Sequence, residues 1–199
     1  MRKRFVEYAR RLCVVFMIVI CVNGCDSREE EKVKTAKEDT GVKTATLVVA
    51  SPAFKEGELM PKEFTADGEN VSPPLAWSNV PDDAKSIALV CEDPDAPRGT
   101  FVHWVIFNID PKASGLPRAV PTAAMLQGGA QQGRNDFGKV GYGGPAPPAG
   151  PAHRYYFKVY ALDAPLALES GAKKEDLLSE IEGHVLAEGQ VMARYGRSK

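Results

Sequence analysis

Two stretches of the sequence decide which fold and which site we expect: Cys91–Asn108, which reads CEDPDAPRGTFVHWVIFN, and Gly141–Leu162, which reads GYGGPAPPAGPAHRYYFKVYAL. The first is an acidic turn bracketed by prolines, and it leads into a strand that carries His103. The second is a loop rich in glycine and proline, and it leads into a strand that opens with His153. Each strand brings a loop and a histidine, so the two together can form one small polar pocket.

Strand patterns lie within these two stretches and directly beside them. Ser86–Cys91 and Phe101–Ile109 are rich in valine, isoleucine and aromatic residues and are flanked by aspartate and proline, which is typical of strands. In Arg154–Leu162 (RYYFKVYAL), apolar side chains recur at every second position, so they share one face of a strand. The long segment Gly128–Pro151 exceeds the usual loop length in compact domains, and such loops are often functional.

A helical pattern occurs only near the C-terminal end. Leu177, Leu178 and Ile181 have helical spacing, and Gly183 ends that segment. We interpret Val185–Tyr195 as a second short helix. Many irregular strands followed by short helices predict a mainly β protein, a β-sandwich with short helices at the C-terminus.

The N-terminal residues have the pattern of a lipoprotein signal peptide, which we assign to residues 1–24. A basic region precedes Leu12–Val22, an apolar run shorter than the ~20 residues that a membrane-spanning helix needs. The run ends in Val22-Asn23-Gly24-Cys25, which resembles a bacterial lipobox, so we expect Cys25 to be lipidated. A plain signal peptide and an uncleaved anchor are the alternatives.

The segment 25–43 is dense in charge and nearly free of large apolar residues, which predicts a flexible tether in front of a domain at 44–199. Removal of residues 1–24, with five basic side chains and Glu7, would change the net charge from −1 to −5. We therefore expect a lipid-anchored protein of the bacterial cell envelope that faces the periplasm. Asp26, directly after the lipidated cysteine, favours the inner membrane.

The composition excludes several classes of protein. Charged residues are nearly balanced, with 25 basic and 26 acidic side chains, so we expect no nucleic-acid partner. The sequence lacks Walker, Rossmann, G-x-S-x-G and H-E-x-x-H patterns, and we expect neither a cofactor nor a metal. Of the four cysteines, only Cys91 would remain unmodified in the domain, and its apolar neighbours predict a buried small hydrophobe.

The polar residues of the two stretches each allow two interpretations. Asp93 and Asp95 can act at a binding site or can cap a turn by accepting backbone N–H bonds. His103 lies on an apolar strand face, where a histidine is commonly a hydrogen-bonded core residue. His153 directly follows a long loop, where binding residues tend to occur.

The motifs in combination resemble a known family. DPDAP followed by HW, and then GYGGP, PP, HRYYF and VYALD, are similar to the phosphatidylethanolamine-binding protein family, also called Raf kinase inhibitor-like. FTADGENVSPPLAW and HVLAEGQVMARYGR resemble its bacterial YbhB/YbcL branch in particular. The resemblance covers roughly Thr44 to Arg197.

This resemblance implies a Greek-key β-sandwich with a small anion-binding cavity at one end. It assigns ligand-binding positions to six residues: Asp93 at the cavity floor, His103 in the core strand, Gly144 in a loop whose backbone faces the anion, Pro148 at the rim, and His153 and Tyr155 pointing inward. It favours the binding interpretation for Asp93, His103 and His153, and leaves Asp95 open.

Three functions follow as hypotheses. The first is noncatalytic binding of a small anionic or phosphorylated ligand, such as a phospholipid head group or a phospho-compound. The second is inhibition or modulation of a protein partner, a protease or a kinase. The third is a small hydrolase that uses Asp93 and His103 as acid and base, although no nucleophile accompanies them. We expect a binding protein rather than an enzyme, attached to the membrane through its lipid, and leave homodimer formation open.

Overall fold

The computed structural model describes residues 44–198. Its main sheet has six strands in the order β1-β9-β8-β4-β5-β7, and a smaller sheet has three in the order β2-β3-β6. The predicted signal peptide, the tether and Cys25 lie outside the described residues. The main sheet comprises β1 (Ala45–Thr46), β9 (Val185–Tyr195), β8 (His153–Leu162), β4 (Ser86–Asp93), β5 (Phe101–Ile109) and β7 (Gln131–Gln132). The smaller sheet comprises β2 (Val48–Ala50), β3 (Leu75–Ser78) and β6 (Gly115–Leu116).

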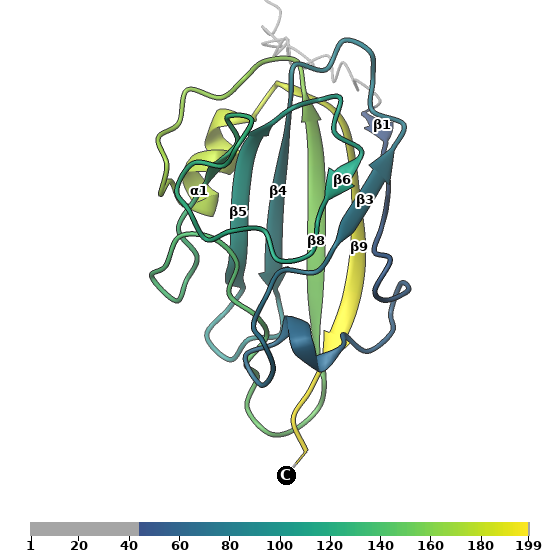
Figure 1. The fold of residues 1–199 in the computed structure, drawn as a ribbon, viewed down its shortest axis with the longest axis vertical. Helices are drawn as coiled ribbons and strands as arrows, with labels where there is room; N and C mark the ends of the chain where they lie inside the picture. The colour runs from purple at the N-terminus through teal and green to yellow at the C-terminus, as the bar shows by residue number, and fades with distance from the viewer. Residues whose placement is uncertain (1–43, 199) are drawn as a thin grey trace, which may run out of the picture. The chain divides into compact units, whose positions relative to one another are not determined.

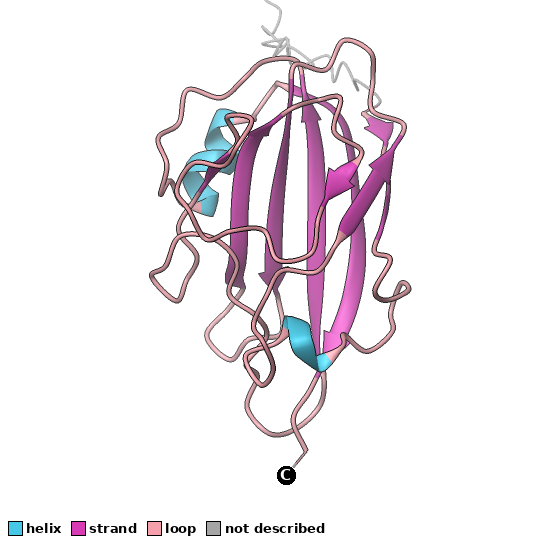
Figure 2. Ribbon diagram, in the orientation of Figure 1, coloured by secondary structure: helices cyan, strands magenta, loops and turns pink. Residues whose placement is uncertain are grey.

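The two sheets enclose the larger of two apolar cores. Figure 1 shows the long strands β5, β4, β8 and β9 side by side, with β3 and β6 in front of them. Strand β8 alternates as its sequence predicts, since Tyr155, Phe157, Val159 and Ala161 are all fully buried in this core. The fold is therefore mainly β, as predicted, and strands and loops account for most of the described chain in Figure 2.

A second, smaller core lies on the opposite face of the main sheet. Leu177 and Ile181, from and directly after the helix α1 (Lys174–Glu180), belong to the same apolar cluster as Val90 of β4 and Phe107 of β5. Because both of its faces are covered, β4 is buried along its whole length. A single-turn 3-10 helix, η1 (Lys62–Phe64), is the other helical element of residues 44–198. No helix in this part of the chain is long and apolar enough to cross a membrane.

The predicted second helix at Val185–Tyr195 is wrong, because this segment is strand β9. It pairs antiparallel with β8 along its whole length, from Val185 opposite Leu162 to Tyr195 opposite His153. The alternation of small apolar and polar residues in AEGQVMAR has a period of two, which is the period of a strand rather than of a helix. At Gly189 a Cβ atom would lie only 2.3 Å from the Leu47 carbonyl oxygen, so tertiary packing also requires glycine there.

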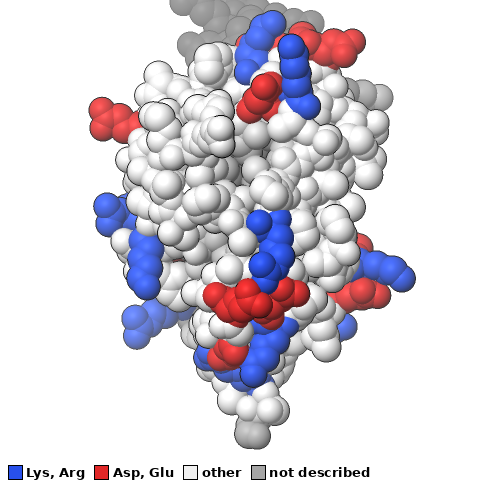
Figure 3. Space-filling view, in the orientation of Figure 1, with Lys and Arg blue, Asp and Glu red and all other residues white. Residues whose placement is uncertain are grey.

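Charges of both signs are interspersed over the face shown in Figure 3, without an extended patch of one sign among its described residues. One ion-pair cluster lies on the sheet face that α1 covers. There the buried Glu92 contacts Lys158 of β8 at 2.6 Å and Lys174 of α1. Cys91, the residue before Glu92, is fully buried in the larger apolar core, as expected of a small hydrophobe. Burial raises the pKa of its thiol.

Candidate functional site

A cavity of about 200 Å³ lies at the end of the main sheet where β4 ends and where β5 and β8 begin. The antiparallel register brings these ends together, since Asp93 pairs with Phe101 and Glu92 pairs with Tyr156. Five of the six predicted ligand-binding residues line the cavity: Asp93, His103, Pro148, His153 and Tyr155. Sequence reasoning did not assign the other six lining residues: Ala96, Pro97, Phe101, Phe137, Ala146 and Pro147.

Asp93 and His153 form a hydrogen-bonded pair at the cavity. His153 Nδ1 lies 2.8 Å from Asp93 Oδ2, and Asp93 Oδ1 accepts the backbone N–H of Asp95 at 2.8 Å. The two side chains are only 12% and 4% exposed. A carboxylate accepts hydrogen bonds, so the pair fixes the proton of His153 on Nδ1 and directs Nε2 away from Asp93. When Nε2 is also protonated, the adjacent carboxylate balances the charge of the ring, and Nε2–H becomes a donor.

Asp95, which sequence reasoning left open, does not line the cavity. Its carboxylate accepts bonds from the guanidinium of Arg154 at 2.6 and 2.9 Å and from the Arg154 backbone N–H at 2.9 Å. These bonds to Arg154 lower the pKa of Asp95 to about 2. Since Arg154 follows His153 directly, Asp95 positions the start of β8 beside the cavity.

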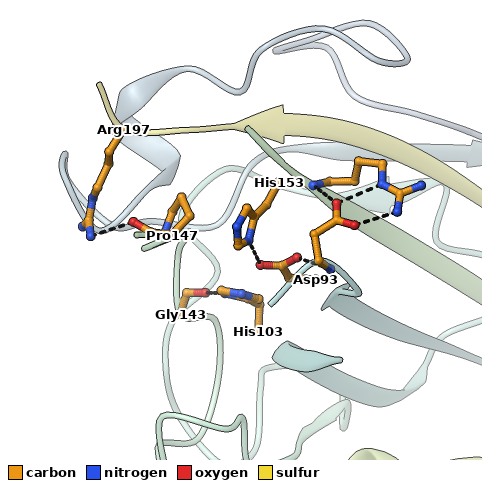
Figure 4. A network of polar contacts seen from close by, with 8 residues as sticks. Asp93, His103, Gly143, Pro147, His153 and Arg197 are labelled. Carbon is orange, nitrogen blue, oxygen red and sulfur yellow. Dashed lines mark hydrogen bonds and ion pairs between the residues drawn. The ribbon is translucent and has the colours of Figure 1, made fainter. Parts of the chain in front are cut away.

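His103 differs from His153 in its surroundings. Its Nδ1 lies 2.6 Å from the carbonyl oxygen of Gly143, as Figure 4 shows, and its ring packs edge-on against Tyr155 and Phe137. The residue is 3% exposed, and burial lowers its pKa in spite of the nearby carboxylate of Asp93. His103 therefore favours the neutral imidazole.

Tyr155 contributes a buried hydroxyl that lies near the Asp93 carboxylate but forms no well-aligned hydrogen bond with any described residue. Burial, together with the negative charge of Asp93, raises the pKa of this phenol, so the hydroxyl keeps its proton. Buried polar groups are normally paired, and an unpaired one at a cavity is a candidate for bonding to a ligand.

Gly144 is placed differently from what the resemblance implied. It does not line the cavity, and its backbone N–H donates to Asn70 Oδ1 at 2.7 Å. A Cβ atom on Gly144 would lie 2.7 Å from the Phe64 carbonyl oxygen, so glycine allows this loop to pack closely against the segment before it. Gly144 thus holds the loop in place, and its N–H is already engaged.

The C-terminal segment holds the rim of the cavity, a role that sequence reasoning missed. Arg197 donates to both carboxylate oxygens of Asp67 at 2.6 and 2.7 Å and to the Pro147 carbonyl oxygen at 3.1 Å. Figure 4 shows Arg197 and Pro147 on the far side of His153 from Asp93. Tyr195 adds a hydroxyl bond to Asp67 at 2.8 Å. Arg197 lies in the terminal motif of the resemblance, which was the available signal for it.

The cavity thus combines one carboxylate, two imidazoles and one phenol hydroxyl with a wall of aromatic and proline side chains. Within residues 44–198, no group of three or more histidine, cysteine, aspartate or glutamate side chains is placed to hold a metal ion. The polar groups present can donate to and accept from a small oxyanion.

Comparisons with known proteins identify the family and the fold. The family model described as "Phosphatidylethanolamine-binding protein" matches residues 50–196. A "UPF0098 protein" of Methanothermobacter thermautotrophicus is 54% identical over 145 residues, which cover 73% of this chain and 95% of that protein. Another "UPF0098 protein", from Aquifex aeolicus, is 44% identical over 155 residues, covering 77% and 90% of the two chains.

Two crystal structures are similar in fold. A putative phosphatidylethanolamine-binding protein homologue of Chlamydia trachomatis superposes with a TM-score of 0.71 at 39% identity, covering 77% of this chain and 99% of that one. YbcL of Escherichia coli, described as a member of the mammalian PEBP family, superposes with a TM-score of 0.69 at 33% identity, covering 77% and 100%. Both similarities extend over nearly the whole of the solved chain.

Proposed function

This chain belongs to the phosphatidylethanolamine-binding protein family, and on that premise we propose that it binds a small anionic or phosphorylated ligand in the cavity at the end of its main sheet without catalysing a reaction. The observation that carries the proposal is the Asp93–His153 pair at 2.8 Å beside the unpaired Tyr155 hydroxyl. Protonated on Nε2, His153 donates to an anion while Asp93 stays bonded to Nδ1.

The size of the cavity limits the ligand. Pockets for drug-sized molecules measure roughly 300–1,000 Å³, whereas this cavity measures about 200 Å³. It therefore accommodates a phosphate-sized group with a short substituent, either a phospholipid head group or a soluble phospho-compound. Phe101 and Phe137 pack edge to face, 4.7 Å between ring centroids, and provide an apolar wall for such a substituent.

Thermal unfolding of the full chain tests this function. The panel comprises inorganic phosphate, phosphoethanolamine and glycerophosphoethanolamine. A ligand at tenfold excess over its Kd stabilises the folded state by about 1.4 kcal/mol. We expect stabilisation by at least one compound and its loss in His153→Asn, which keeps a donor to Asp93 but lacks Nε2. His184→Asn is the matched control, because the His184 side chain is half-exposed and its ring bonds the Asp163 carboxylate, away from the cavity. Failure of every compound to stabilise the protein would contradict the proposal.

We further propose that the protein is a lipoprotein of the cell envelope, tethered through Cys25 by residues 25–43. The support is the sequence pattern of residues 1–25, with its basic region, apolar run and terminal cysteine. Cys25→Ser should move the protein from the membrane fraction to the soluble fraction, whereas Cys13→Ser should not. Membrane retention of Cys25→Ser would count against the lipid anchor.

A further inference from the structure

The two histidines of the cavity differ in the partner of Nδ1, a backbone carbonyl for His103 and the Asp93 carboxylate for His153, and this difference carries an inference that rests on the proposed function. A backbone carbonyl only accepts hydrogen bonds, so the 2.6 Å contact between His103 Nδ1 and the Gly143 oxygen requires the proton on Nδ1. In the neutral ring Nε2 is then a bare acceptor. Among the described residues, the His103 ring forms a hydrogen bond only through Nδ1.

The surroundings of His103 keep the ring neutral. Its ring neighbours are Phe101, Phe137 and Tyr155, none of which carries a charge. Burial acts against protonation, while the bond to the Gly143 carbonyl and the charges of Asp93 and Asp136 act in its favour, and the net effect lowers the pKa of His103. The other basic group of the cavity, His153, is paired with Asp93.

A ligand in this cavity therefore meets both donors and an acceptor. The Tyr155 hydroxyl and a protonated His153 can donate, whereas His103 Nε2 can only accept. Asp93 adds a negative charge beside them. A fully ionised oxyanion such as sulfate has acceptors alone, so one of its oxygens would face the lone pair of His103 without a proton between them. An unpaired buried acceptor of this kind destabilises the complex.

We propose that the cavity selects an oxyanion that still carries a proton, namely a hydrogen phosphate group, over one that carries none. The proton of the ligand bonds to His103 Nε2, and its ionised oxygens accept from Tyr155 and His153. Free hydrogen phosphate and a monoprotonated phosphomonoester both satisfy this requirement. A phosphodiester, the form of phosphate in most phospholipids, does not.

Calorimetric titration of the full chain with three probes at pH ~7.5 tests the proposal. The hydrogen phosphate dianion and the sulfate dianion have the same shape and charge, but only hydrogen phosphate carries a proton. Dimethyl phosphate carries a single negative charge and no proton. We expect phosphate to bind at least about fivefold more tightly than either. Sulfate or dimethyl phosphate binding as tightly as phosphate would overturn the proposal while leaving anion binding intact. If none of the three binds, this inference fails, and thermal unfolding with phosphoethanolamine and glycerophosphoethanolamine decides separately whether the proposed function stands.

Two further experiments test whether His103 and the proton of the ligand cause the preference for phosphate. His103→Asn keeps an amide donor for Gly143 but has no atom at the Nε2 position, so its preference for phosphate over dimethyl phosphate should fall toward one. His184→Asn should retain the full preference; an unchanged preference in His103→Asn would overturn the role of His103.

Methyl phosphate distinguishes a phosphomonoester from the free ion, because its affinity should fall as pH rises above its second pKa of about 6. A methyl phosphate affinity that does not fall over this range would contradict the requirement for a proton.

Discussion

Asp93 and His153 are sixty residues apart in the sequence, yet Asp93 Oδ2 and His153 Nδ1 lie 2.8 Å apart at the end of the main sheet. The register of β4 with β8 brings them together, and the backbone N–H of Asp95 holds the second carboxylate oxygen. This pair gives the cavity a histidine of fixed orientation whose charge is balanced locally.

Tyr155→Phe should stabilise the protein or leave its stability unchanged, and should weaken phosphate binding. The hydroxyl is buried without a partner among the described residues, and such a group costs about 1–3 kcal/mol of stability. Tyr142→Phe is the matched control, because the buried Tyr142 hydroxyl donates to the Phe64 carbonyl oxygen at 2.7 Å. The control should lose about 1 kcal/mol of unfolding free energy in urea and keep its affinity. Destabilisation of Tyr155→Phe equal to that of the control would refute this prediction.

Arg197→Lys should weaken phosphate binding with little change in stability. A lysine cannot bond both oxygens of Asp67 and also reach the Pro147 carbonyl, so the rim at 146–148 loses its support. The Arg197–Asp67 pair is partly exposed to solvent, and ion pairs of this kind contribute little to stability. Calorimetry measures the phosphate affinity, and thermal unfolding measures the stability. Arg118→Lys, which perturbs a surface pair with Glu63 and Glu69, should leave affinity unchanged; an equal loss in both variants would rule out a specific role for the rim.

The free energy of unfolding should decrease as pH falls below ~6.5. The folded pKa of His103 is lowered by burial, so between the unfolded and folded values the unfolded chain binds more protons. Stability from His103 is therefore fully present above the unfolded pKa and is lost as pH falls through the folded one. Urea unfolding at pH 5 to 8, values that bracket the ordinary histidine pKa of about 6.5, measures this slope. The slope should be smaller in His103→Asn, and an identical slope would show that other groups cause it.

Glu92→Gln should reduce stability without changing phosphate affinity. Desolvation by burial opposes ionisation of Glu92, but bonds to Lys158 and Lys174 outweigh it and lower the pKa of the carboxyl. Removing the charge leaves two partly buried ammonium groups without their partner, at a cost of about 1–3 kcal/mol after solvent screening. Because this cluster lies on the sheet face that α1 covers, a change in affinity in calorimetry would contradict its separation from the cavity.

Periodicity predicted the parts of the fold that depend on local sequence. The alternation in β8 and the spacing of Leu177 and Ile181 in and beside α1 identified those elements, whereas β9 was misassigned although its residues alternate. The period of two in AEGQVMAR was the available signal for a strand, and pairing with β8 along the whole segment confirms it. Local patterns could not reveal that β9 lies between β1 and β8.

From the sequence, the site could be predicted only as a group of residues, without the contacts that hold them in place. The motifs placed Asp93, His103 and His153 in one pocket, but they did not show that Asn70, seventy-four residues earlier, occupies the N–H of Gly144. The contact between Asp67 and Arg197 spans 130 residues. Such long-range bonds depend on how loops pack over the ends of the sheet, and no local sequence pattern determines them.

The most direct test of the central claim is an NMR titration of the full chain with inorganic phosphate that follows the ring signals of its three histidines. If the cavity binds the anion, the signals of His103 and His153 shift and saturate together at millimolar phosphate or below, while those of His184 stay in place. If the cavity does not bind it, the His103 and His153 signals remain unchanged, or all three histidines drift in parallel without saturation.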